Sequence, residues 1–144
     1  MRNGKYVRKT SETDIEVSIN LDGSGKSDLV TGIGFFDHML DQLARHSMVD
    51  LRIRASGDLH IDNHHTVEDV GICIGKALSE SLGDKNGINR YASTLLPMDD
   101  ALIQVALDLS GRPYLSWQVQ FPTNKIGTFD TELFEEFFRA VSSS

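Results

Sequence analysis

The sequence predicts an α+β fold, because segments with the two-residue period of strands alternate with segments of helical period. A length of 144 residues fits a single domain, 1–144, and 40% hydrophobic with 24% charged residues is ordinary globular composition. The order of strands and helices also repeats along the chain. We therefore expect two related half-repeats, residues 8–86 and an incomplete 87–144.

The elements of the first half follow from these periods in order. Residues 14–21 alternate apolar and polar side chains, and a DGSG turn ends this strand. Residues 35–47 carry apolar side chains at helical spacing. Residues 51–62 alternate again on both sides of Gly57, which predicts a strand. Residues 64–82 then predict a second helix, which a glycine ends.

The second half predicts strands at roughly 90–96, 101–109 and 113–121 and a helix from about residue 130, with Asp130 as its N-cap. Two motifs of the first half recur in it. The matching residues are Leu21, Asp22, Ser24 and Gly25 with Leu107, Asp108, Ser110 and Gly111, and Gly34, Phe36, Asp37 and Leu40 with Gly127, Phe129, Asp130 and Leu133.

By the spacing of this repeat, a second copy of residues 64–69 would fall beyond Ser144. We therefore expect the second half to lack one strand and one helix. Such a half exposes a sheet edge and the apolar face of its last helix, including Leu133, Phe134, Phe137 and Phe138.

Three metal-ligand side chains stand at the start of the helix over 64–82. Glu68 is three and four residues from His65 and His64, so it shares a side of the first turn with each of them. The two imidazoles project about 100° apart around the axis, so they suit two different ions better than one. The set fits manganese, iron or zinc. A hydrogen-bonded N-terminal turn is the alternative interpretation.

The helix over 35–47 carries His38, Gln42 and His46 on one face at intervals of four residues. His38 is the natural additional ligand if this face packs against His64. We interpret Asp37 and Asp41 as solvated helix charges.

Other candidates have weaker signals. Arg90 and Arg112 stand beside turns, where a guanidinium could hold a phosphate or form a surface ion pair. Glu12 cannot be told from a solvated N-terminal charge by pattern. A nucleotide loop is rejected, because no complete G-x-G-x-x-G or Lys-Ser/Thr follows Gly34. Cys73 lies within an apolar helix and is expected in the core.

The formal net charge of −7 argues against nonspecific nucleic-acid binding. The N-terminus has no apolar segment of a secretory signal, and nothing in the composition indicates a membrane protein. With one cysteine, no internal disulfide can form. We therefore expect a soluble protein of the cytoplasm.

Three motifs together carry a family resemblance: TGIGFFDHML at 31–40, GDLHIDNHHTVED at 57–69 and DLSGRPY at 108–114. In this order they closely resemble imidazoleglycerol-phosphate dehydratase of histidine biosynthesis, over about residues 8–140. The resemblance implies two fused half-domains, each a four-stranded sheet backed by two helices, as in ribosomal protein S5 domain 2. It also implies a homo-oligomer of 24 subunits for the full-length chain, with active sites between subunits and two Mn²⁺ ions in each.

The same resemblance implies roles for individual residues. The matches to family metal ligands are His38, His64, His65 and Glu68. Glu12 matches the proposed acid–base residue, Gln42 lines the same site, and Arg90 and Arg112 match positions that hold the substrate phosphate across subunit contacts. A second His-His-x-x-Glu motif and a C-terminal Ser-Ser-Lys-Gly loop of the family are absent from these 144 residues.

The implied reaction is loss of water from imidazoleglycerol phosphate to give imidazole-acetol phosphate. The proton to be removed lies on an unactivated carbon, so metal ions on the imidazole would act as Lewis acids and template while Glu12 moves the proton. Two alternatives stay open from the residues: a metal-dependent hydrolase and a non-catalytic metal-binding fragment.

Overall fold

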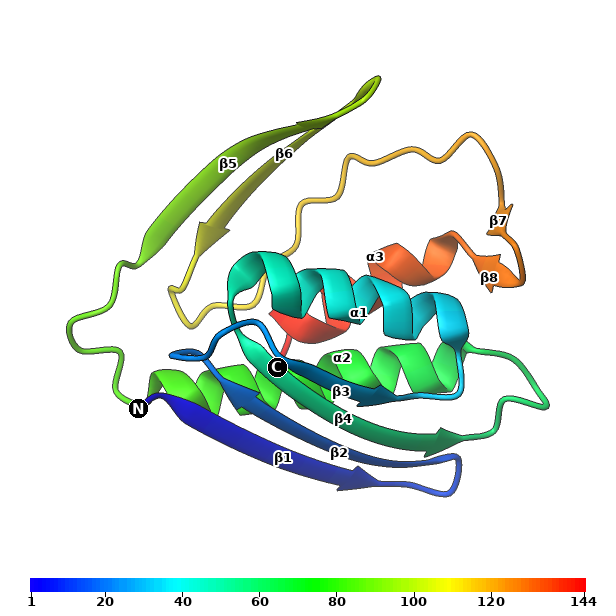
Figure 1. Cartoon of the computed structure of the whole chain (residues 1–144), viewed down its shortest axis with the longest axis horizontal. Helices are drawn as coiled ribbons and strands as arrows, with labels where there is room; N and C mark the ends of the chain where they lie inside the picture. The colour runs from blue at the N-terminus through cyan, green and yellow to red at the C-terminus, as the bar shows by residue number, and fades with distance from the viewer.

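The computed structural model describes all 144 residues and has a four-stranded sheet with helices on one face (Figure 1). The sheet order is β1-β2-β4-β3, with β3 parallel to β4 and the other neighbours antiparallel. These elements are β1 (Asn3–Lys9), β2 (Thr13–Asn20), β3 (Ser27–Val30), α1 (Gly34–Ser47), β4 (Asp50–Gly57) and α2 (His64–Leu82). The predicted α+β class, and the four-stranded sheet with two helices, are confirmed.

The alternation in β2 decides which face of the sheet is covered. Ile15, Val17 and Ile19 are buried, while the residues between them face outward. Across the ladder with β4, Val17 lies opposite Ile53. α2 packs on β1 and β2, and α1 packs mainly on β3. The core therefore lies between the sheet and these two helices.

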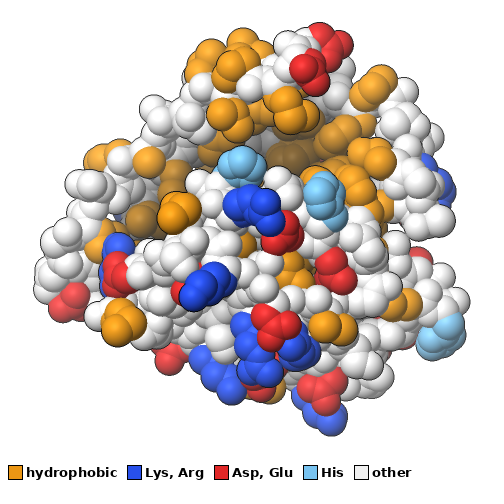
Figure 2. All heavy atoms as spheres, viewed as in Figure 1, with side chains coloured by type: hydrophobic (Ala, Val, Ile, Leu, Met, Phe, Trp, Pro, Cys, Tyr) orange, Lys and Arg blue, Asp and Glu red, His pale blue; other side chains and the backbone are white.

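The rest of the chain forms a hairpin and a helix that pack very differently. The elements are β5 (Tyr91–Met98), β6 (Ala101–Asp108), the two-residue strands β7 (Lys125–Ile126) and β8 (Phe129–Asp130), and α3 (Glu132–Ser142). The β5–β6 hairpin stands away from the sheet and every residue in it is exposed (Figure 1). Figure 2 shows hydrophobic side chains gathered around the hollow beneath it, and charged ones on the opposite side of the molecule.

The expectation that the last helix exposes its apolar face is wrong for most of that face. α3 packs against α2, which buries Leu133 and Phe137 and leaves only Phe138 of the four named residues exposed. The ring of Phe137 meets that of Phe36 edge-on, with centroids 5.5 Å apart. One side of α2 therefore packs on the sheet, and another side packs against α3.

Three sequence predictions of secondary structure are wrong. Residues 59–62 form a turn rather than the end of a strand, and 113–121 form no strand. Alternation of apolar and polar residues predicts a half-buried segment, but it does not predict a neighbouring strand. Without a neighbouring strand, a segment cannot form the backbone hydrogen bonds of a sheet. The N-cap of α3 is Thr131 rather than Asp130, whose carboxylate instead lies 2.8 Å from Lys125 Nζ.

The sequence analysis missed β1 and β3. The inward positions of β1 include Gly4 and the partly buried Arg8, so its pattern is not apolar. β3 has only four residues. No helix is long and apolar enough to cross a bilayer.

Candidate active site

Three connections meet at one end of the four-stranded sheet (Figure 1). They are the β1–β2 turn, the β3–α1 connection and the β4–α2 loop, at residues 10–12, 31–33 and 58–63. A Cβ added to Gly32, whose φ is +81°, would lie 2.7 Å from Leu59 Cδ1. The absence of a side chain at Gly32 thus lets two of the connections touch. β1, β3 and β4 all end here, so Glu12, His38 and His64, which follow them in the chain, lie at this end of the sheet.

The ring of His65 is held by an acid from the β4–α2 loop. Its Nδ1 lies 2.8 Å from Asp58 Oδ2. This hydrogen bond is the largest cause that raises the pKa of His65 and also the largest that lowers the pKa of Asp58. Nε2 is the nitrogen left for a ligand, which is the arrangement that metal-binding histidines commonly have.

The rings of His64 and His65 are not parallel. The two rings are 84° apart in plane and their centroids are 6.3 Å apart. His64 Nε2 lies 3.6 Å from Glu68 Oε2, one helical turn along α2. The pairing of His64 with Glu68 is the predicted i, i+4 contact.

The α1 residues have partners of their own. Asp37 accepts hydrogen bonds from the amide and the hydroxyl of Thr31, and Asp41 accepts one from Ser27 Oγ at 2.6 Å. The interpretation of these two aspartates as simply solvated charges is therefore wrong: they fasten the start of α1 and the edge strand β3. Gln42 Nε2 lies 3.3 Å from Asp41 Oδ2.

A complete coordination shell does not form within one copy of the chain. No group of three or more His, Cys, Asp or Glu side chains is close enough to hold an ion. His38 is exposed on α1, and it does not join His64 and Glu68 in such a group. The structure thus brings together His64 and Glu68 rather than the whole set of predicted ligands.

Glu12 lies in the β1–β2 turn and faces solvent. Hydrogen bonds from the side chains of Ser11 and then Thr10 lower its pKa, with a smaller electrostatic contribution from His65. Glu12 in turn contributes to the raised pKa of His65. The carboxylate is therefore ionised at neutral pH and within electrostatic range of a predicted metal ligand, so it can accept a proton.

The predicted phosphate-binding arginines lie elsewhere. Arg90 donates two hydrogen bonds to Asp108, at 2.7 and 3.2 Å, and its guanidinium lies 4.9 Å from the ring centre of Tyr91. Arg112 follows β6, where its backbone N–H donates to Ser110 Oγ at 3.1 Å. Figure 1 shows this base of the hairpin on the side of the molecule opposite the start of α2. One copy of the chain does not bring the arginines to His64.

Sequence reasoning missed two acids at this end of the sheet. Asp58 orients His65, and the buried Asp69 accepts hydrogen bonds from Arg8 Nε at 2.9 Å and Thr13 Oγ1 at 2.5 Å. The position of Asp69, four residues after His65 on α2, was the available signal. Nothing in the sequence pattern marks Asp58.

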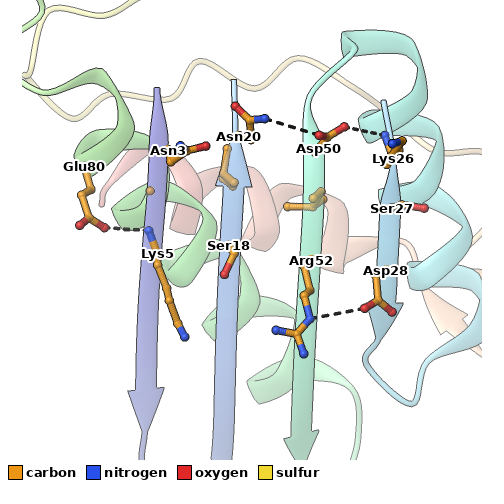
Figure 3. Close-up of a pocket in the computed structure, with 13 residues that line it drawn as sticks. Asn3, Lys5, Ser18, Asn20, Lys26, Ser27, Asp28, Asp50, Arg52 and Glu80 are labelled. Carbon is orange, nitrogen blue, oxygen red and sulfur yellow. Dashed lines mark hydrogen bonds and ion pairs between the residues drawn. The ribbon is translucent and has the colours of Figure 1, made fainter. Parts of the chain in front are cut away.

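A broad depression also lies on the outer face of the sheet, at the opposite end from Glu12 (Figure 3). Among its charged groups, Arg52 Nε lies 3.4 Å from Asp28 Oδ2, and Asp50 and Glu80 accept hydrogen bonds from backbone N–H groups. The depression holds no histidine or cysteine. It therefore lacks the imidazole groups found at the end of the sheet where the three connections meet.

Comparisons with known proteins agree in sequence and in structure. The family model described as imidazoleglycerol-phosphate dehydratase matches residues 31–144. Imidazoleglycerol-phosphate dehydratases of Roseobacter denitrificans and Paracoccus denitrificans are each 66% identical over 143 residues, which are 99% of this chain and 73% of the relative. Among solved structures, the enzyme from Staphylococcus aureus superposes with a TM-score of 0.85 at 44% identity, covering 97% of this chain and 77% of that one. The enzyme from Pyrococcus furiosus gives 0.81 at 36%, covering 96% and 73%.

Proposed function

The chain belongs to the imidazoleglycerol-phosphate dehydratase family, and on this premise we propose that it dehydrates its substrate with metal ions and Glu12 at the end of the sheet where α1 and α2 begin. The family's activity makes it a lyase of histidine biosynthesis that acts on a small molecule. Family membership favours this reaction over hydrolysis and over a non-catalytic metal-binding role.

The donor groups fit the two Mn²⁺ ions that we propose as cofactors. Imidazole and carboxylate are ligands that manganese accepts, and the orientation of His65 by Asp58 leaves Nε2 available. The proposed ligands are His38, His64, His65 and Glu68. The adjacent positions of the two histidines on α2, about 100° apart around the helix axis, support two ions rather than one. When bound, such ions would supply Lewis-acid polarisation of the substrate's imidazole ring.

We further propose that the site is completed by neighbouring copies in a homo-oligomer, of 24 subunits for the full-length protein. Three observations support this. One copy contains no group of three ligands, and Arg90 and Arg112 lie away from the start of α2. The exposed apolar side chains of β5–β6 are also of the kind that subunit contacts cover. A cytoplasmic location, where histidine biosynthesis would have its substrates, is part of the same proposal.

Within this site, the chain's own residues have distinct tasks. The carboxylate of Glu12 transfers the proton at the side-chain carbon of the substrate, since it is ionised and its turn lies at the same end of the sheet as the start of α2. Gln42 lines the site from α1. Arg90 and Arg112 hold the phosphate of a substrate bound mainly by a neighbouring copy, and their fork geometry suits phosphate oxygens. For Arg90, the phosphate must compete with Asp108.

The position of the Glu12 turn at the same end of the sheet as the start of α2 is the observation that carries this proposal, and substitution of Glu12 tests it. Glu12→Gln keeps the size of the side chain but cannot accept the proton. We expect turnover to fall by about 10²–10⁴-fold while metal content and substrate binding stay unchanged. Steady-state kinetics, with metal analysis and calorimetry, measure these quantities.

Glu12→Asp is the matched control, because it keeps a carboxylate and should retain more turnover than Glu12→Gln. Wild-type turnover in the Gln variant would remove Glu12 from the reaction.

A further inference from the structure

Asp69 is the only charged side chain among the buried residues, with 8% of its surface exposed. A buried carboxylate is unfavourable unless hydrogen bonds and a counter-charge compensate for lost water. Asp69 lies on α2 four residues after His65, so both residues project from one side of the same helix. The proposed reaction gives Asp69 no direct task.

Both partners of Asp69 flank the β1–β2 turn. Arg8, near the end of β1, donates from Nε to Oδ1 at 2.9 Å, and Thr13, the first residue of β2, donates from Oγ1 to Oδ2 at 2.5 Å. A carboxylate can only accept, so the hydroxyl hydrogen of the buried Thr13 is committed to Asp69. The two oxygens of one helical side chain thereby fasten both strands that lead into the turn.

The turn is also tied together internally as far as Glu12. Thr10 Oγ1 accepts hydrogen bonds from the backbone N–H of Glu12 at 3.1 Å and of Thr13 at 3.0 Å. The hydroxyl groups of Thr10 and Thr13 are 3.2 Å apart, and Thr10 N donates to Thr13 O at 2.8 Å. A continuous set of hydrogen bonds thus leads from Asp69 through Thr13 and Thr10 to the backbone of Glu12.

We propose that Asp69 is a positioning residue, which fixes the Glu12 carboxylate relative to His65 through Thr13 and Thr10. Helix α2 then carries both His65, a proposed metal ligand, and Asp69, which holds the turn that contains Glu12. One rigid element therefore sets the distance between the proton acceptor and a substrate bound at the metal site. This role rests on the proposed function of Glu12.

A pair of substitutions at Thr13 tests the role with the least disturbance. Thr13→Val has nearly the same shape but no hydroxyl, whereas Thr13→Ser keeps the hydroxyl. We expect Thr13→Val to lower kcat by about 10- to 100-fold with KM and bound metal unchanged, because misplacement of a catalytic group has effects of this size. Thr13→Ser should restore most of kcat. Asp69→Asn, which loses one of two acceptor oxygens, should resemble Thr13→Val.

The link to Glu12 is measured by combining Thr13→Val with Glu12→Gln. If Thr13 acts through Glu12, the valine substitution should not reduce the residual turnover of the Glu12→Gln enzyme further. An unchanged kcat in Thr13→Val, or a further loss of the same factor in the double variant, would overturn the proposal.

Hydrogen exchange separates this inference from the acid–base role of Glu12. The Glu12 amide should exchange at least about tenfold faster in Thr13→Val than in Thr13→Ser, since its hydrogen bond to Thr10 loses support. Equal exchange in the two variants overturns the positioning role whatever the activity. Full turnover in Glu12→Gln instead overturns the proposed function. The difference in hydrogen exchange between Thr13→Val and Thr13→Ser then still tests whether Asp69 and Thr13 hold the turn.

Discussion

The side chain of Asp58 fixes the orientation of one imidazole in the candidate site. It approaches His65 Nδ1 at 2.8 Å, and its side chain is only 15% exposed, so the contact is partly shielded from water. One of its oxygens, Oδ1, is buried without a protein partner. At the scale of single residues, the orientation of His65 therefore depends on an acid that is not itself a proposed ligand.

Asp58→Ala should weaken Mn²⁺ binding by about 10–100-fold, the usual effect of losing a carboxylate that orients a histidine ligand. Metal titration followed by electron paramagnetic resonance measures the affinity. Asp100→Ala, which removes an exposed acid at the tip of the β5–β6 hairpin, is the control and should bind as the parent does. An unchanged affinity in Asp58→Ala would separate this carboxylate from the metal site.

Asp50 gives a pH-dependent contribution to stability. The backbone N–H groups of Ser24 and Lys26 donate to its Oδ1 at 2.8 and 2.9 Å, and they lower its pKa below the ordinary 3.8. A depressed carboxyl pKa in the folded state stabilises the protein above the ordinary pKa, and this stabilisation is lost as pH falls through the folded pKa.

Asp50→Asn should therefore lower stability at pH 7 and flatten its decline below about pH 4, where this carboxyl is protonated in the unfolded chain before it is protonated in the folded protein. Urea unfolding as a function of pH measures both effects. If the stability of the variant fell as steeply as that of the wild type below about pH 4, Asp50 would make no contribution in this pH range.

At the scale of elements, two glycines of α2 allow α3 to approach closely. A Cβ added to Gly71 would lie 2.8 Å from Phe137 O and 2.9 Å from Ala140 Cβ. One added to Gly75 would lie 2.6 Å from Val141 O. Both glycines are buried and have ordinary helical backbone conformations, so space rather than dihedral freedom explains their presence. The burial of α3 thus depends on the absence of side chains on α2.

Gly71→Ala should destabilise the fold by about 1–3 kcal/mol, because α3 must move to admit the methyl group. Gly34→Ala is the matched control: it lies at the start of α1 with nothing within 4 Å of the added Cβ, and it should be neutral or slightly stabilising. Thermal unfolding of both variants checks the difference. Equal melting temperatures would contradict the close packing of α2 and α3.

At the scale of the whole molecule, the groups that we propose for the reaction are divided between two regions. Glu12 and the start of α2 occupy one end of the sheet, while Arg90 and Arg112 lie at the base of the hairpin (Figure 1). The separation is what an active site shared between subunits requires. It also means that two variants defective in different regions can compensate for each other.

Mixed oligomers of His65→Ala and Arg90→Ala test this division. Each variant alone should be inactive or nearly so, and random mixing should restore up to about a quarter of wild-type activity, because a quarter of shared sites would combine two intact contributions. Co-expression of differently tagged copies, followed by an assay of the doubly purified oligomer, measures the recovery. Mixing two preparations of the same variant is the control. No recovery in a verified mixed oligomer would place all groups within one copy.

Sequence alone determined the long elements and the position of the histidine motif. The helices over 34–47 and 64–82 and the strand over 13–20 were predictable within about a residue, because their periods reflect burial on one side. The burial of Cys73 was likewise predictable from its apolar surroundings, and this burial raises its pKa to about 11. The assignment of metal ligands, acid–base residue and phosphate contacts stays a prediction.

Only the tertiary structure decided which segments become neighbours. It paired β1 and β3 into the sheet, left 113–121 without a strand partner and buried α3 on two glycines of α2. It also revealed the contact of Asp58 with His65 across the β4–α2 loop, and the contacts of Asp69 with Arg8 and Thr13, which are far away in the chain. The physical reason is that the spacing of apolar residues in a segment reflects which of its residues are buried. Strand pairing and hydrogen bonding depend instead on which other segment lies opposite.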